Sequence, residues 1–122
     1  MYNVILIAKE TLTRSLIGAQ LMEEGFEVTG AASIAEAAAQ VNTQGISPHL
    51  VIVDASEQDL SPKTVRLLSG LCPQTPLLLI HGTSDSPSQL NWQGKICRLA
   101  RPLTVGHVVD AVQRLLQGFS PL

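Results

Sequence analysis

The sequence is poor in aromatic residues and in charge. Phe, Trp and Tyr make up 3% of the 122 residues, and Asp, Glu, Lys and Arg make up 15%. The formal net charge is -2, and the Lys and Arg residues form no run. Because nucleic-acid-binding surfaces are usually basic and clustered, we expect no nucleic acid as a partner. With hydrophobic residues at 45%, the composition also excludes an intrinsically disordered chain.

Cysteine and long apolar runs are scarce as well. The two cysteines, Cys72 and Cys97, have neither the spacing of a metal site nor that of a redox motif, and their apolar neighbours predict small core residues. The apolar run at residues 4–7 is too short for a signal peptide and has no basic flank. No run approaches the length of a membrane span. We therefore expect a cytoplasmic protein without a membrane segment.

Short apolar runs alternate with helical patterns along the chain. Strands are predicted at residues 4–7, 26–30, 50–53, 77–80 and 96–100. Helices are predicted at residues 11–24, 33–43, 61–71 and 105–117, with a weaker pattern at 86–94. Short connections and right-handed crossovers turn such an order into a parallel sheet with helices on both faces. We expect one α/β domain of the doubly wound, flavodoxin-like kind at residues 1–118, followed by a tail or the start of a linker at 119–122.

The first helix has a cap, an apolar face and a stop signal. Thr11 is expected to cap it at the start, and Gly25 suits its C-terminal stop. The face expected to be buried consists of Leu12, Leu16 and Ala19.

The later helices have clearer signals. Ser33 and Glu36 have the spacing of a capping box. Ser61-Pro62 places a cap and a proline in the first helical position. The last helix, closed by Gly118, has one apolar stripe, which consists of Val105, Val108, Val109, Val112, Leu115 and Leu116.

Ligands in such a fold bind at the carboxyl ends of the strands, here residues 8–10, 54–57, 81–83 and 101–102. Asp54 stands out because it follows four apolar residues, and an isolated buried carboxylate is costly. It is either a cap or turn residue, or a functional acid. Arg101-Pro102 ends the fifth strand and is expected at the same edge of the sheet.

Several landmarks together resemble the receiver domain of response regulators. They are the first strand followed by Glu10, the turn 25–28, the segment Leu50–Asp54, and the basic residue and proline at Arg101-Pro102. The resemblance covers nearly the whole chain. It implies a CheY-like domain of a two-component phosphorelay, in which Asp54 stands at the position that accepts a phosphoryl group from a histidine kinase.

The other positions of that family's site differ in this chain. The acid pair that holds magnesium is replaced by Ala8-Lys9, and only Glu10 follows. The phosphate-contacting hydroxyl is replaced by His81, which precedes Gly82, and the lysine before Pro102 by Arg101.

Two further family positions also differ. Glu57-Gln58 stands where a Met-Pro is usual after the phosphoacceptor, and Arg98 occupies the aromatic switch position. His81 is either a phosphate contact or a histidine satisfied by nearby backbone.

These departures predict a degenerate receiver. Magnesium needs oxygen ligands, usually including more than one anionic group, and Glu10 with Asp54 is the remaining pair of carboxylates. Lys9 places a cation near the metal position, which disfavours a dication. We therefore expect no cofactor, and we expect Lys9, together with Arg101, to act as a counterion of Asp54. The alternative is that Lys9 points to solvent.

Three functions compete. The first is a pseudo-receiver that signals through a protein partner, either a histidine kinase or an output domain. It would use the last strand and helix, where the basic residues Lys95, Arg98, Arg101 and Arg114 cluster in sequence. Whether it forms a homodimer stays open.

The second function keeps Asp54 as a magnesium-dependent phosphoacceptor. The third is a flavodoxin-like small-molecule binder or enzyme. It needs a phosphate loop after the first strand, and residues 8–13 contain no glycine. Without a nucleophile–base pair either, we expect no enzyme.

Overall fold

Five parallel strands form one sheet in the order β2-β1-β3-β4-β5. The computed structural model describes residues 1–82, 90, 92–101 and 104–117. The strands are β1 (Asn3–Ile7), β2 (Glu27–Ala31), β3 (Leu50–Asp54), β4 (Leu77–His81) and β5 (Ile96–Ala100). The predicted strands are therefore confirmed, with ends that differ by at most one residue.

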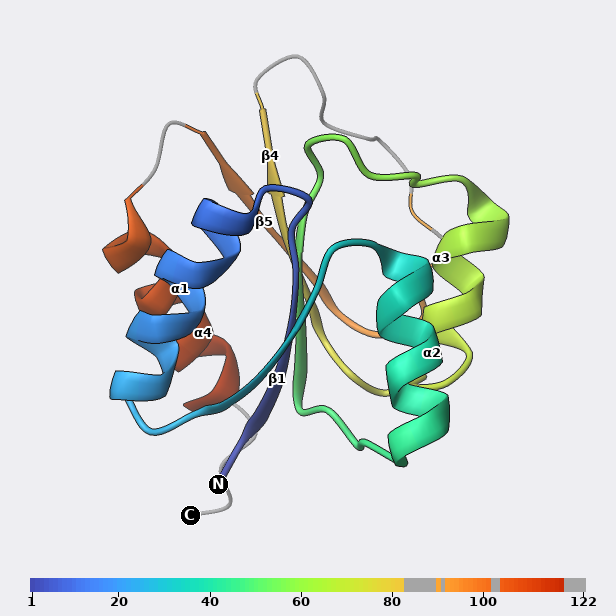
Figure 1. Cartoon of the computed structure of the whole chain (residues 1–122), viewed down its shortest axis with the longest axis horizontal. Helices are drawn as coiled ribbons and strands as arrows, with labels where there is room; N and C mark the ends of the chain where they lie inside the picture. Colours follow the sequence, from blue (N-terminus) through green and yellow to red (C-terminus); the bar gives the residue numbers. More distant parts are fainter. Residues whose placement is uncertain (83–89, 91, 102–103, 118–122) are drawn as a thin grey trace.

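Helices cover both faces of this sheet, which Figure 1 shows nearly edge-on. They are α1 (Thr11–Glu23), α2 (Ile34–Gln44), α3 (Pro62–Ser69) and α4 (Val105–Gln117). In Figure 1, α1 and α4 lie on one face, and α2 and α3 lie on the other. Two apolar clusters fill the spaces between the sheet and these two helix layers. The predicted α/β architecture is confirmed.

The central strands are buried because both of their faces meet helices. All five residues of β3 are buried, as the continuous apolar run requires. On β1, Ile5 contributes to the cluster under α2 and α3, and Leu6 contributes to the cluster under α1 and α4. This alternation follows from the two-residue repeat of a strand. The edge strand β2 is more exposed.

Capping fixes two of the helix starts as predicted. The Ser33 hydroxyl accepts the backbone N–H of Glu36 at 3.1 Å, and the Glu36 carboxylate accepts the backbone N–H of Ala32 at 3.1 Å. Ser61 caps α3 by accepting the N–H of Thr64, with a proline in its first turn. The last helix also has the predicted stripe, in which Val108, Val109, Val112, Leu115 and Leu116 are buried and Val105 is half-buried.

The predicted start and buried face of α1 are wrong. Its N-cap is Glu10, not Thr11, and the Glu10 side chain makes no capping hydrogen bond. Leu12 and Leu16 are 64% and 53% exposed. The buried residues are instead Ile17, Gly18 and Leu21.

Two apolar stripes run along α1, and packing decides between them. A Cβ atom on Gly18 would lie 3.7 Å from Leu6 and 3.8 Å from Val28, so this face approaches the sheet most closely. Gly25 does end the helix as predicted, with a φ angle of 94° that glycine adopts readily.

Between β4 and β5, Trp92 is buried in the apolar cluster beside α3. Its indole N–H donates to the Thr75 carbonyl at 2.8 Å, and the next backbone N–H, that of Gln93, donates to the Ser69 hydroxyl at 3.1 Å. The predicted helix at 86–94 lies largely outside the described residues, as do Gly118 and the tail at 119–122. Within the described part of the chain, no helix is long and apolar enough to cross a membrane.

Candidate functional site

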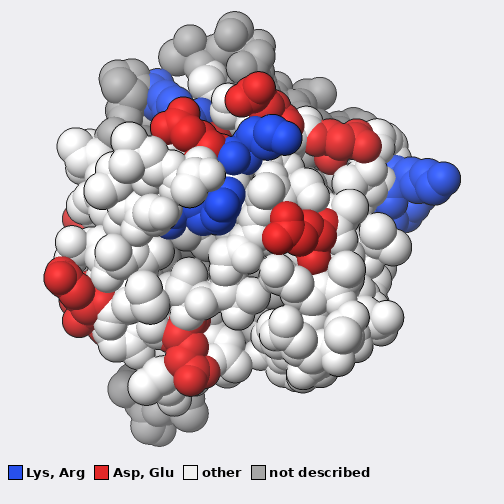
Figure 2. Space-filling model, viewed as in Figure 1, with Lys and Arg blue, Asp and Glu red and all other residues white. Residues whose placement is uncertain are grey.

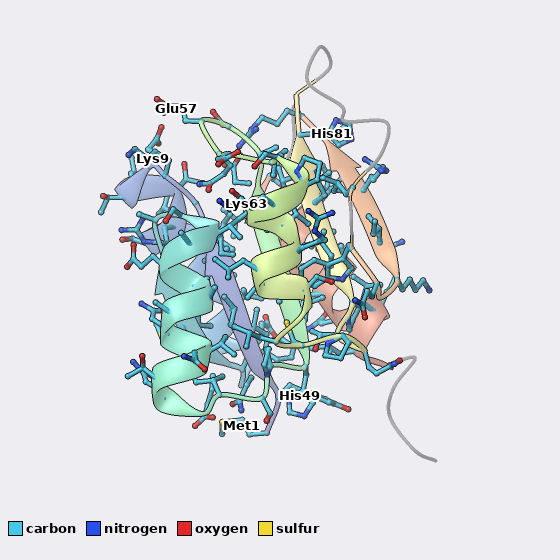
Figure 3. All side chains as sticks on the ribbon, turned by 90° about the vertical axis from the view of Figure 1, so that its right-hand side faces the viewer. Met1, Lys9, His49, Glu57, Lys63 and His81 are labelled. Atoms are coloured by element: carbon cyan, nitrogen blue, oxygen red, sulfur yellow. The ribbon has the colours of Figure 1, made fainter. Side chains whose placement is uncertain are left out.

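The loops that follow the strands meet at one end of the sheet. Figure 3 shows Lys9, Glu57 and His81 at this end, and Met1 and His49 at the opposite end. Lys9 and Glu57 follow β1 and β3, and His81 ends β4. All three therefore lie at the carboxyl ends of parallel strands. The sequence-based expectation that the strand ends form one edge is therefore confirmed.

Asp54 is the last residue of β3 and is only 5% exposed. One carboxylate oxygen, Oδ1, accepts the backbone N–H of Ser56 at 3.1 Å. The other, Oδ2, accepts a hydrogen bond from the Arg101 guanidinium, with which it forms an ion pair. Both oxygens of the buried carboxylate therefore have partners. Asp54 is a turn residue and an ion-pair acceptor at once.

Arg101 reaches Asp54 from two strands away. It follows β5 directly, and β4 lies between β5 and β3. The backbone N–H of Arg101 donates to the His81 carbonyl at 2.9 Å, which extends the pairing of β4 and β5 by one residue. The side chain starts from this fixed position and is 36% exposed. The prediction that Arg101 and Asp54 share an edge is confirmed, and Pro102 lies outside the described residues.

The expectation that Lys9 neutralises Asp54 is wrong, and the solvent-exposed alternative holds. Ala8 is buried, and its N–H donates to the Ala31 carbonyl at 3.0 Å, so it continues β1. Lys9 is exposed in the turn toward α1. Among the residues that the structure describes, the ion pair of Asp54 is the one with Arg101. A long lysine side chain reaches water easily, whereas the Arg101 side chain lies across the strand ends.

Glu10 does not turn toward Asp54. Its side chain is exposed, and its Oε1 atom accepts the hydroxyl of Thr13 at 2.9 Å. The contact ties Glu10 to the first turn of α1.

Arg14 is a site residue that the sequence analysis missed. Its Nη1 atom donates to the Ala8 carbonyl at 2.6 Å, and its methylene stem crosses Gly30, where an added Cβ would lie 3.3 Å from Arg14 Cδ. The guanidinium therefore lies at the carboxyl end of β1. A basic residue in the first turn of a helix that follows a strand is the signal that could have revealed it.

His81 ends β4 and is half-buried. Its Nδ1 atom lies 2.9 Å from the Gly82 carbonyl oxygen. Because a carbonyl only accepts, this contact needs a hydrogen on Nδ1. The backbone-satisfied alternative for His81 therefore matches the structure.

The loop after Asp54 is held by its backbone and by one glutamine. Glu57 has a φ angle of 59°, and the Gln58 N–H donates to the Ala55 carbonyl at 3.1 Å. The Gln58 side chain donates to the Ala32 carbonyl at 2.9 Å, which ties this loop to the one after β2. Gln58, at the second residue of the usual Met-Pro position, thus has structural contacts in this chain.

A cavity of about 370 Å³ lies beside the ion pair, between α1 and α4. Its lining consists of Thr13, Leu16, Ile17, Asp54, Ile80, Arg101 and Val105. The sequence analysis missed it, because its walls come from four separate elements. Figure 2 shows acidic and basic side chains intermixed around the upper end of the face seen there.

The arrangement of this chain is similar to that of known structures, although its sequence matches no family model and no curated protein. A response regulator receiver domain from Clostridium thermocellum superposes with a TM-score of 0.76 at 19% identity, over 96% of this chain and 95% of that one. The Vibrio cholerae chemotaxis protein CheY4 superposes with a TM-score of 0.74 at 22% identity, over 94% of this chain and 98% of that one. The receiver domain of the hybrid histidine kinase CckA superposes with a TM-score of 0.72 at 20% identity, over 94% of this chain and 99% of that one. The chain has the receiver-domain fold.

The donor groups at this edge do not fit the magnesium ion that receiver domains hold. Ala8 offers a methyl group and Lys9 a cation where the acid pair stands in the family. Both carboxylate oxygens of Asp54 accept hydrogen bonds. In the described part of the chain, no group of three or more His, Cys, Asp or Glu side chains is placed to hold a metal. Magnesium prefers two or more oxygen ligands, including carboxylates, and such a set is not assembled here.

Proposed function

We propose that this chain is a degenerate receiver domain of a two-component system, which acts through protein–protein contacts without magnesium-dependent phosphorylation. The receiver fold supports the signalling class. The Asp54–Arg101 ion pair is the observation that carries the proposal. It places a cation on the carboxylate that would otherwise bind the metal and attack the phosphodonor.

Electrostatics explains why the ion pair disfavours a metal ion at Asp54. Phosphoryl transfer depends on positive charge that stabilises the transferring group, and a metal ion normally supplies much of it. Arg101 supplies a permanent positive charge instead, since arginine stays protonated in proteins. Arg14 adds a second one at the end of β1. Two cations at this edge disfavour a dication, and the Arg101 guanidinium holds Asp54 in one state.

The proposed partner is a protein, either a histidine kinase or an output domain. The surface includes the edge strand β5, with exposed Arg98 and with Lys95 just before the strand, and α4, with exposed Arg114. Arg101 contributes less to this surface than the sequence suggested, because its guanidinium is paired with Asp54. We propose no enzyme activity.

The test adds magnesium and acetyl phosphate to the purified chain. We expect no phosphorylated species by intact-mass spectrometry and no rise in melting temperature with magnesium alone, because a ligand that binds only the native state would raise it. A matched sample of a receiver with a complete acid pair shows that the assay works. A phosphorylated species that disappears in Asp54→Asn would establish the alternative, a phosphorylatable receiver with Asp54 as acceptor.

A further inference from the structure

The cavity between α1 and α4 has the size and lining of a small-molecule site. Its volume of about 370 Å³ falls in the range of roughly 300–1,000 Å³ typical of ligand pockets. An apolar cavity of about 150 Å³ already suffices for benzene in another protein. The space here therefore accommodates an aromatic ring with a short substituent.

One part of the cavity is apolar and reaches the surface. Leu16 and Ile17 line it from α1, Val105 from α4 and Ile80 from β4. Leu16 is 53% exposed, although it lines a concave wall. A ligand with an apolar body would cover this side chain and remove its surface from water, which is favourable in proportion to the apolar area buried.

The other part of the cavity is polar and favours a ligand that accepts hydrogen bonds. Arg101 lines this part, and its guanidinium carries several N–H donors, of which Nη2 donates to Asp54. Asp54 is already satisfied by Ser56 and Arg101. An ammonium ligand would meet the Arg101 cation beside Asp54, whereas a carboxylate can pair with that cation. Carboxylates fit the planar guanidinium well.

The neighbouring acid does not block such a ligand. Glu10 is exposed and bonded to the Thr13 hydroxyl, and it is not among the residues that line the cavity. Its charge is therefore screened by solvent.

We propose that this cavity binds a small carboxylate with an apolar, ring-sized body, whose carboxylate contacts Arg101 and whose body lies against Leu16 and Val105. The proposed binding site depends only on the geometry of the cavity and of Arg101. Its use as an input to signalling, in place of a phosphoryl group, rests on the proposed function. Such a ligand would contact α1, α4 and the ion pair together.

The experiment titrates phenylacetate into the isotope-labelled full chain and follows amide shifts by NMR. We expect saturable shifts centred on Leu16, Ile17, Arg101 and Val105. Phenylacetamide, without the charge, should bind about tenfold more weakly, a difference of about 1.4 kcal/mol. Phenethylamine, with the opposite charge, should bind more weakly still. Tighter binding of phenethylamine than of phenylacetate would overturn the proposal, because the acid would then be the recognition group.

Two variants on one helix locate the site. Leu16→Trp fills the cavity from an exposed position and should weaken phenylacetate binding about tenfold or more. Leu12→Trp is the matched control, because Leu12 is 64% exposed on the same helix but does not line the cavity. It should leave the affinity unchanged. Melting curves verify that both variants fold.

Equal affinity in the Leu16→Trp and Leu12→Trp variants, or no saturable shift at all, would overturn the site. Phosphorylation of Asp54 in the separate acetyl phosphate assay would overturn the proposed function and leave the binding result standing.

Discussion

The Arg101 guanidinium pairs with the Asp54 carboxylate across the end of β4, the strand that separates β5 from β3. The acid is almost fully buried, whereas the base remains 36% exposed. A buried carboxylate without a partner is costly, so the pair explains how Asp54 is kept at a strand end inside the fold. The partial exposure of Arg101 keeps part of that charge accessible to a ligand.

The ion pair predicts a coupled loss of stability. Arg101→Ala leaves Asp54 underpaired and should lower the free energy of unfolding by about 1–3 kcal/mol in urea denaturation. Asp54→Ala should also destabilise, and the double variant should lose less than the sum of the two single losses. Lys9→Ala is the control, and it should stay within about 0.5 kcal/mol because Lys9 is exposed. Additive losses at residues 54 and 101 would contradict the pairing.

Restoring the acids should create a magnesium site. The variant combines Ala8→Asp, Lys9→Asp and Arg101→Lys, which supplies carboxylates and removes the guanidinium from Asp54. Magnesium should then raise the melting temperature in a saturable manner, since ligand binding stabilises the native state. The unmodified chain should show no such shift, and adding Asp54→Asn to the variant should abolish it. A shift that survives this last substitution would mean that the metal binds elsewhere.

The packing of α4 is tested at Val109. This side chain is buried against the sheet, so Val109→Asp places an unpaired charge in the core and should cost about 3 kcal/mol or more in unfolding free energy. The neighbouring Asp110 is exposed, and Asp110→Ala should change stability by no more than about 0.5 kcal/mol. Similar melting temperatures for the two variants would argue against this placement of α4.

Asp59, before α3, should titrate at low pH. The backbone N–H of Ser61 and then the hydroxyl of Thr64 hold the pKa of its carboxyl below the usual value of 3.8. Since the folded-state pKa is below the unfolded one, the stability that Asp59 contributes is present above the unfolded pKa and is lost as the pH falls through the folded pKa.

An NMR titration of the carboxyl carbon measures this pKa. Thr64→Val removes the hydroxyl bond and should raise the Asp59 pKa toward its usual value. Thr64→Ser keeps a hydroxyl and should preserve the low pKa. An unchanged pKa in Thr64→Val would exclude the hydroxyl as a cause.

The sequence by itself determined the architecture and the edge that carries the site. Alternating apolar runs and helical patterns predict a parallel sheet, because short connections and right-handed crossovers place each helix on a face of the sheet. That order brings Asp54 and Arg101 to one edge. Local capping signals such as Ser33 with Glu36 were also sufficient, because they act over one helical turn.

Only the tertiary structure decided which side chains meet. The place of Lys9 at a metal-ligand position of the resembled family favoured it as the counterion, whereas the strand order brings Arg101 over Asp54 and Lys9 is exposed to solvent. The choice between the two apolar stripes of α1 depended on how closely Gly18 approaches the sheet, and this left Leu16 on the wall of a cavity. No local sequence pattern predicts a cavity, because the distances between elements far apart in the chain determine its lining.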